Sequence, residues 1–272
     1  MINRIFTLAA LCFMTTLGAH AFTTDTVTVA ADPYLETPMK VTVITPDGNG
    51  PVAGAFPTVY LLNGYGGDYA SWGNVRPDLG ELADQFGVVM VMPDGRDSWY
   101  FDSTVNPKVK MESFITKTLV PYIDEKYPTV KAPEYRAITG LSMGGHGAYW
   151  LGLRHPDIWK NIGSTSGGVN FLPFPSRWKI AQALGEYKDN PEVWESHTII
   201  NLVPSIKPGA QNLIFDCGSE DFFAEVNQNF HQALLDAKIP HDYISRPGVH
   251  NRDYWNNALP YQLMYFSTKF GK

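Results

Sequence analysis

The sequence predicts an α/β fold with a mostly parallel central sheet, helices on both faces and an antiparallel edge near the N-terminus. Short apolar runs of the kind found in strands buried on both faces alternate with longer helix-like stretches. Two earlier segments instead alternate apolar and polar residues, as antiparallel strands commonly do. After a short apolar start, about 250 residues remain, which fits one large domain of this class.

The first 21 residues have the pattern of a secretory signal peptide. One basic residue precedes an apolar run from Ile5 to Leu17, which is too short to span a bilayer comfortably. Ala19 and Ala21 are the small residues expected at a cleavage site before Phe22. We therefore expect residues 1–21 to be removed and the protein to be exported, periplasmic or extracellular, without a membrane span after cleavage.

Residues 22–272 have the composition of a soluble enzyme with a substantial core. The formal charge of −6 and the pI of 5.6 argue against a nucleic-acid partner, since no basic stripe is present. The two cysteines are Cys12, within the predicted signal peptide, and Cys217. The exported protein therefore has no internal disulfide. Cys217 lies in an apolar run and is expected to be a small core residue rather than a nucleophile.

The expected elements follow from these patterns in chain order. The alternating segments 25–30 and 39–44 predict an antiparallel pair, and a proline- and glycine-containing turn at 46–50 follows them. Short apolar runs predict parallel strands at 57–62, 88–92, 136–141 and 213–217, with a last strand at 242–245. The intervening stretches predict helices at 77–86, 108–127, 145–154 and 221–237. In such sheets the chemistry belongs beyond the carboxyl ends of the strands.

The segment 167–210 departs from this alternation. It carries several aromatic residues among prolines and charges but shows no clear buried strand. Because long inserts in compact domains are often functional, we expect it to cross the sheet edge and form part of the active-site wall.

The most informative motif is the run from Gly140 to Gly144, Gly-Leu-Ser-Met-Gly, between a predicted strand and a helix rich in small residues. This pattern is typical of a nucleophile elbow, whose serine stands on a sharp turn. The flanking glycines allow strand and helix to approach closely. The motif predicts Ser142 as a nucleophile and the backbone N–H of Met143, at a helix N-terminus, as one oxyanion donor.

A serine nucleophile needs a histidine base, and the base needs an acid that holds its tautomer. Of the downstream histidines, which also include His197, His250 follows the last predicted strand on a loop. By contrast, His155 is explained as a cap at a helix end, His231 lies within a helix and His241 begins a strand. For the acid, Asp221 follows a glycine turn beyond the strand at 213–217. Glu220 remains a competitor, and Asp216, inside the apolar run, is expected to make a structural hydrogen bond.

The second oxyanion donor is expected in the loop after strand 57–62, which reads Asn63-Gly-Tyr-Gly-Gly67. Its glycines let a backbone N–H turn toward the site, and we predict Tyr65 as the donor, with Gly66 as the alternative. A phosphate-binding loop is disfavoured because the lysine and the following Ser/Thr of a P-loop are absent.

Together these segments resemble the putative-esterase family of α/β-hydrolases, which includes esterase D (S-formylglutathione hydrolase), feruloyl and acetylxylan esterases, tributyrin-type esterases and mycobacterial mycolyltransferases. The resemblance spans most of the mature chain and is carried by residues 60–67, 92–95, 98–100, 140–145, 218–222 and 250–255. It implies the α/β-hydrolase fold for residues 22–272 and assigns nucleophile, acid and base to Ser142, Asp221 and His250. The family usually has histidine at the position of Asn63.

The resemblance implies a serine carboxylesterase that works through an acyl-enzyme and needs no metal and no other cofactor. Export favours a small-molecule or polysaccharide-borne ester, such as acetyl or feruloyl groups on plant polysaccharide. Substrate contacts are expected from Gly66, Trp72, Trp99 and Tyr100. The alternatives are acyl transfer to a sugar or lipid acceptor and a non-catalytic binding protein on the same scaffold. The oligomeric state is left open.

Overall fold

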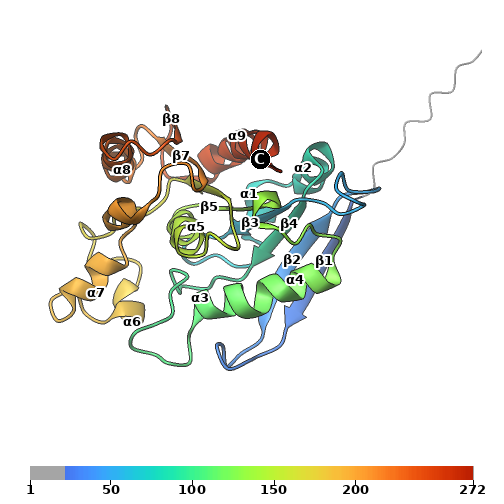
Figure 1. The fold of residues 1–272 in the computed structure, drawn as a ribbon. Helices are drawn as coiled ribbons and strands as arrows, with labels where there is room; N and C mark the ends of the chain where they lie inside the picture. The colour runs from blue at the N-terminus through green and yellow to red at the C-terminus, as the bar shows by residue number, and fades with distance from the viewer. Residues whose placement is uncertain (1–21, 272) are drawn as a thin grey trace, which may run out of the picture.

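The computed structural model describes residues 22–271, in which eight strands form one sheet (Figure 1). The strand order is β1-β2-β4-β3-β5-β6-β7-β8. The bounds are β1 Thr23–Val29, β2 Met39–Thr45, β3 Thr58–Leu62, β4 Val89–Pro93, β5 Arg136–Gly140, β6 Asn161–Thr165, β7 Asn212–Gly218 and β8 Asp242–Arg246. Pairings β1/β2 and β2/β4 are antiparallel, and the other pairings are parallel. This confirms the predicted fold class. The predicted signal peptide lies outside the described residues.

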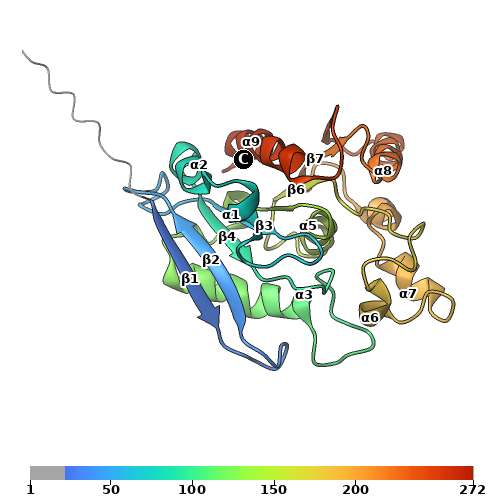
Figure 2. The same ribbon diagram turned by 180° about the vertical axis from the view of Figure 1, so that it is seen from behind.

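Helices cover both faces of the sheet (Figures 1 and 2). Their bounds are α1 Ser71–Val75, α2 Leu79–Phe86, α3 Met111–Phe114, α4 Val120–Lys126, α5 Met143–Arg154, α6 Ile180–Leu184, α7 Pro191–Ser196, α8 Ala224–Asp236 and α9 Arg252–Lys269. Helices α1, α2 and α9 share one apolar core with the sheet, while α3, α4, α5 and α8 share the other. None of the helices within residues 22–271 combines the length and apolarity needed to cross a membrane.

The two cores arise from the period-2 geometry of the central strands. In β3, Tyr60 and Leu62 join the core beneath α5, whereas Val59 and Leu61 join the core beneath α9. All five residues of β3, and likewise of β4, are buried. Continuous apolar runs are therefore needed, because every side chain of a doubly covered strand leaves water.

Several elements were not predicted from the sequence, among them strand β6, helix α9 and the short helices α1, α6 and α7. Strand β6 reads Asn-Ile-Gly-Ser-Thr and carries one large apolar residue, so hydrophobicity does not mark it. It is nevertheless buried throughout, because β5 and β7 pair with it on either side and helices α5 and α9 pack on its two faces. Helix α9 contains Pro260 and starts at a cap in which the Asn251 side chain accepts from the N–H of Tyr254.

The single helix expected at 108–127 is divided. A π-helical turn, Ile115–Leu119, separates α3 from α4. The hydroxyl of Thr116 donates to the carbonyl of Glu112 at 2.8 Å and so gives this carbonyl a hydrogen-bond partner next to the widened turn. The expected 221–237 helix begins at Ala224, so Asp221 lies in the turn that precedes α8.

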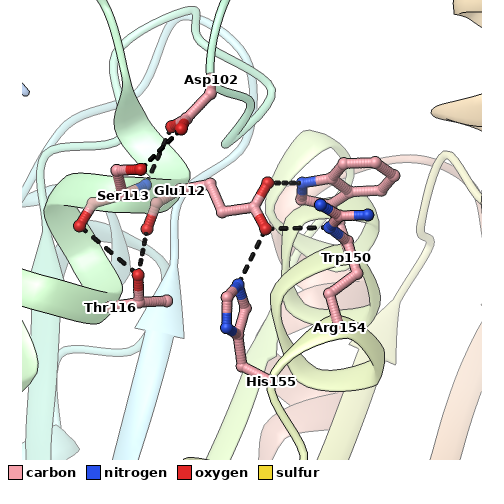
Figure 3. Close-up of polar contacts among 7 residues, drawn as sticks. All are labelled: Asp102, Glu112, Ser113, Thr116, Trp150, Arg154 and His155. Carbon is pink, nitrogen blue, oxygen red and sulfur yellow. Dashed lines mark hydrogen bonds and ion pairs between the residues drawn. The ribbon is translucent and has the colours of Figure 1, made fainter.

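A buried carboxylate joins this divided helix to α5 (Figure 3). The Glu112 side chain, 9% exposed, accepts from Trp150 Nε1, Arg154 Nε and His155 Nε2, each at 2.8 Å. Burial raises the pKa of Glu112, but the hydrogen bonds from His155 and Arg154, the charge of Arg154 and the bond from Trp150 outweigh it and hold the pKa below its usual value. The interaction fixes the C-terminal half of α5, the helix that begins directly after Ser142.

The segment 167–210 holds α6, α7 and a 3₁₀ helix, Ile199–Ser205, and contains no strand. Two of its aromatic residues, Phe171 and Trp194, are fully buried in the core shared with α5. A third, Trp178, is partly exposed and lines the cavity described next.

Candidate active site

Ser142 stands on a strained turn between β5 and α5. Its φ of 56° and ψ of −116° are unusual for a residue with a side chain. A Cβ on Gly140 would lie 2.4 Å from the Gly144 carbonyl, and a Cβ on Gly144 would lie 2.3 Å from the Leu62 carbonyl. Only glycine fits at either position, because strand, turn and helix are in backbone contact there.

The turn brings Ser142 to His250. The two side chains are 2.9 Å apart, from Oγ to Nε2, although 108 residues separate them in the chain. The other ring nitrogen, Nδ1, lies 3.0 and 2.9 Å from the two carboxylate oxygens of Asp221. This geometry matches a nucleophile, its base and the acid that orients the base.

Of the candidate acids, Asp221 contacts His250. It is 5% exposed, and its Oδ1 also accepts from the N–H of Phe223 at 2.8 Å. Glu220 is exposed, and its backbone rather than its carboxylate is engaged, with its N–H on the Gly248 carbonyl. Asp216 lies behind the site, where it accepts from Thr165 and Gln262 at 2.7 and 2.6 Å. Burial raises its pKa.

The backbone N–H groups of Tyr65 and Met143, beside Ser142, have no acceptor within residues 22–271. Met143 opens α5, so its N–H lies at the positive end of the helix. The loop of Tyr65 adjoins the serine, since a Cβ on Gly64 would be 3.4 Å from the Cβ of Ser142. The N–H of Gly66, the alternative donor, instead donates to the Asp97 carboxylate at 3.0 Å.

Asn63 anchors this loop. It is fully buried, and its Oδ1 accepts from the N–H of Gly95 at 2.9 Å and from the Tyr100 hydroxyl at 3.0 Å. Its Nδ2 donates to the Gly64 carbonyl at 2.9 Å. An amide supplies both the acceptor and the donor needed here, so the asparagine at this position holds the loop through both of its polar atoms.

A cavity of about 460 Å³ opens above Ser142 and His250. Its walls come from the loop 64–67, from α1 and from three aromatic side chains, Trp178, Phe222 and Trp255. Phe222 is 50% exposed and lies 4.2 Å from the His250 ring, measured between centroids. It also stacks on Trp178 at 5.8 Å and an interplanar angle of 22°.

Of the four residues expected to contact substrate, Gly66 lines the cavity and the other three do not. Trp72, Trp99 and Tyr100 are at most 2% exposed. The indole of Trp72 donates to the Leu62 carbonyl at 2.9 Å, and that of Trp99 donates to the Trp178 carbonyl at 3.2 Å. Their place is behind the cavity, where they support the loops that form it, because their polar atoms already have partners in the protein.

Sequence reasoning did not identify Phe222 and Trp255 as cavity residues. Both adjoin predicted triad positions, Phe222 directly after Asp221 and Trp255 five residues after His250. That adjacency was the signal available in the sequence. Cys217, by contrast, is buried as expected, and burial raises the pKa of its thiol far above its usual range.

The family described as "Putative esterase" matches residues 33–266, most of the chain. The chain belongs to this esterase family. This confirms the family resemblance that the motifs predicted. The protein is a carboxylic ester hydrolase.

Its relatives fit that membership. An acetyl esterase of Caldicellulosiruptor saccharolyticus is 26% identical over 214 residues, which are 74% of this chain and 80% of the relative. The S-formylglutathione hydrolase of Bos taurus is 29% identical over 186 residues, 59% of this chain and 64% of the relative. A solved ferulic acid esterase superposes with a TM-score of 0.77 at 25% identity, covering 93% of this chain and all of that structure.

Proposed function

We propose that this family esterase hydrolyses its substrates through an acyl-enzyme on Ser142, with His250 as base, Asp221 as the orienting acid and the N–H groups of Tyr65 and Met143 as the oxyanion hole. The observation that carries the proposal is the continuous contact from Ser142 Oγ through both nitrogens of His250 to Asp221.

In the acylation half-reaction, Ser142 Oγ attacks the ester carbonyl carbon while His250 Nε2 takes the hydroxyl proton. The negative charge that forms on the carbonyl oxygen is stabilised by the two free N–H groups. When the carbon–oxygen bond of the alcohol breaks, His250 gives that proton to the departing oxygen. Asp221 stabilises the transient imidazolium and keeps Nδ1 as a donor.

In the deacylation half-reaction, water takes the place of the alcohol. His250 accepts a proton from the water as its oxygen attacks the acyl carbon, and then returns the proton to Ser142 Oγ. The same oxyanion donors act a second time. Transfer to a sugar or lipid hydroxyl would differ in this step alone, because the acceptor would replace water.

The cavity favours esters with a flat or apolar acyl group, such as feruloyl, while leaving room for acetyl. Its aromatic walls, Trp178, Phe222 and Trp255, are adjacent to the reacting atoms, and aromatic surfaces gain from offset or edge contacts with a planar ring. The relatives named for acetyl and ferulic acid esters support the same two substrate classes. Because we also propose that the protein is exported, we propose acyl groups on plant polysaccharide as its substrates. Through Trp178, the segment 167–210 contributes to the wall of the cavity that would hold the substrate.

The test is hydrolysis of a matched panel by the mature protein and its Ser142→Ala variant: p-nitrophenyl acetate, butyrate and octanoate, methyl ferulate and acetylated xylan. Serine-dependent cleavage of ferulate or acetylxylan supports a role in polysaccharide deacylation. Cleavage of simple short esters alone refutes that substrate but keeps the mechanism. Equal rates in Ser142→Ala refute the mechanism. Failure of every ester refutes hydrolysis, and product mass spectra with excess acceptor then test transfer from the same acyl-enzyme.

A second variant tests the aromatic wall. Phe222→Ala removes a half-exposed ring beside His250 while leaving the triad side chains in place. We expect KM for methyl ferulate to rise by roughly fivefold, with a smaller change for p-nitrophenyl acetate, since one lost aromatic contact is worth about 1 kcal/mol. Equal effects on both esters would argue against an acyl-ring subsite at Phe222.

Export is tested separately. We propose that residues 1–21 are a signal peptide removed before Phe22. N-terminal sequencing of the protein recovered from the periplasm or the medium should begin at Phe22. Recovery of a chain that still begins at Met1, from the cytoplasm only, would refute export.

A further inference from the structure

The oxyanion loop is held from outside the triad by one carboxylate. Asp97 Oδ1 accepts from the N–H of Gly66 at 3.0 Å, and Gly66 directly follows the free N–H of Tyr65. Gly66 has a φ of 74°, a conformation that glycine adopts at little cost and that the loop sequence alone does not enforce. The Gly67 N–H donates to the Gly64 carbonyl at 3.0 Å and closes the turn that contains Tyr65 and Gly66. The hydrogen bond from Gly66 to Asp97 adds an anchor outside that turn.

Asp97 is itself well placed to provide this anchor. It lies in the turn after β4, where the side chain of Asp94 accepts from the N–H of Arg96 at 3.0 Å. The Arg96 side chain donates to the carbonyls of Thr37 and Pro38, which ties the turn to the segment before β2. The turn therefore has supports besides its contact with Gly66.

The second carboxylate oxygen faces the cavity wall. Asp97 Oδ2 lies 3.4 Å from Lys179 Nζ, and Lys179 follows Trp178, a wall residue. Both side chains of this pair are substantially exposed, 54% for Lys179 and 35% for Asp97, so the ion pair by itself contributes little. The hydrogen bond to Gly66 is the contact that distinguishes Asp97 from an ordinary surface carboxylate.

We propose that Asp97 is a positioning residue for the oxyanion hole: by holding the Gly66 N–H, it keeps the Tyr65 N–H directed at the substrate oxygen. This inference rests on the proposed function. Asp97 takes no part in bond making and touches no reacting atom. Its effect is expected on kcat, because the charge on the oxygen develops only in the transition state.

The experiment compares Asp97→Ala with Asp97→Asn on p-nitrophenyl acetate. Asp97→Ala removes the acceptor, and we expect kcat to fall roughly 10-fold with KM within about twofold. This is less than the loss for deleting an oxyanion donor, about 10²- to 10³-fold, because the donor remains but is no longer held. Asp97→Asn keeps an oxygen acceptor and should recover kcat to within about threefold of wild type. Asp157→Ala, at an exposed aspartate, is the matched control.

Two further measurements separate positioning from general destabilisation. Binding of a trifluoromethyl ketone, which forms an oxyanion on the serine, should weaken in Asp97→Ala by about the factor lost from kcat/KM. Amide exchange at Gly66, followed by NMR, should accelerate in Asp97→Ala and not in Asp97→Asn. Both readouts remain informative if Asp97→Ala has a lowered Tm, because Asp97→Asn preserves shape.

Three outcomes would overturn the inference. Asp97→Ala could keep wild-type kcat, Asp97→Asn could fall as far as Asp97→Ala, or Gly66 exchange could be unchanged. Wild-type cleavage that depends on Ser142, together with an undiminished Asp97→Ala, refutes this inference alone. Wild-type protein without Ser142-dependent cleavage refutes the proposed function and this inference with it.

Discussion

The buried Glu112 carboxylate offers a prediction whose size follows from its contacts (Figure 3). Glu112→Gln keeps the volume of the side chain, so the substitution leaves no cavity that would add to the loss of stability. Its single amide oxygen can accept from only part of the set of Trp150, Arg154 and His155, and its NH₂ group then faces donors.

The largest loss is expected at Trp150, which is 2% exposed and cannot turn to water; leaving its indole N–H unpaired costs about 1–3 kcal/mol. Arg154 and His155 have side chains 46% and 26% exposed, so solvent replaces much of their contribution, and together they add about 1 kcal/mol. The sum is roughly 2–4 kcal/mol, which lowers Tm by about 4–16 °C for a domain of this size.

The assay is urea unfolding of wild type and Glu112→Gln from pH 7 to pH 3. Because the pKa of Glu112 is held below its usual value in the folded protein, its contribution is fully present above the unfolded pKa and is lost as the pH falls through the folded pKa. The difference between the two proteins should therefore narrow below about pH 4, the usual range for glutamate. A difference under 1 kcal/mol at pH 7, or one that stays constant down to pH 3, would refute this account.

Three further predictions concern the site and the core. Ser142→Ala or His250→Ala should reduce kcat about a million-fold and Asp221→Asn by less, because triad residues act as a unit; near-normal turnover in Ser142→Ala would exclude the mechanism. Gly144→Ala places a Cβ 2.3 Å from the Leu62 carbonyl and must displace the segment leading into the oxyanion loop, so kcat should fall by about 100-fold. Unchanged kinetics in the folded variant would contradict the close approach of Gly144 to Leu62. Burial, together with the charge of His197, lowers the pKa of His146 to about 3 despite backbone hydrogen bonds, so the unfolded state takes up the proton first as the pH falls. Relative to His146→Gln, the wild type should therefore lose up to about 1.4 kcal/mol of unfolding free energy per pH unit from about pH 6.5 toward pH 3. Parallel curves of stability against pH for the two proteins would argue against a buried neutral histidine.

Local patterns carried most of the strand and helix assignments. Where a strand is buried on both faces, as in β3, hydrophobicity alone marks it, and the predicted 57–62 agrees with Thr58–Leu62 to within a residue. Strand β6 was not predicted because the elements around it, rather than its own hydrophobicity, determine its burial. The π-helical turn was not predicted because the helical pattern of 108–127 does not mark a widened turn within it.

The candidate site divides in the same way. The sequence by itself determined the elbow, since Gly140 and Gly144 are required by backbone contacts within and beside one short segment, and it proposed His250 from chain order. Only the tertiary structure decided that Asp221 rather than Glu220 faces His250, because a one-residue shift in a loop reverses which side chain points inward. It likewise decided that Trp72, Trp99 and Tyr100 support the cavity while Phe222 and Trp255 line it. An aromatic side chain has the same composition in either role, and its position relative to the fold determines which role it takes.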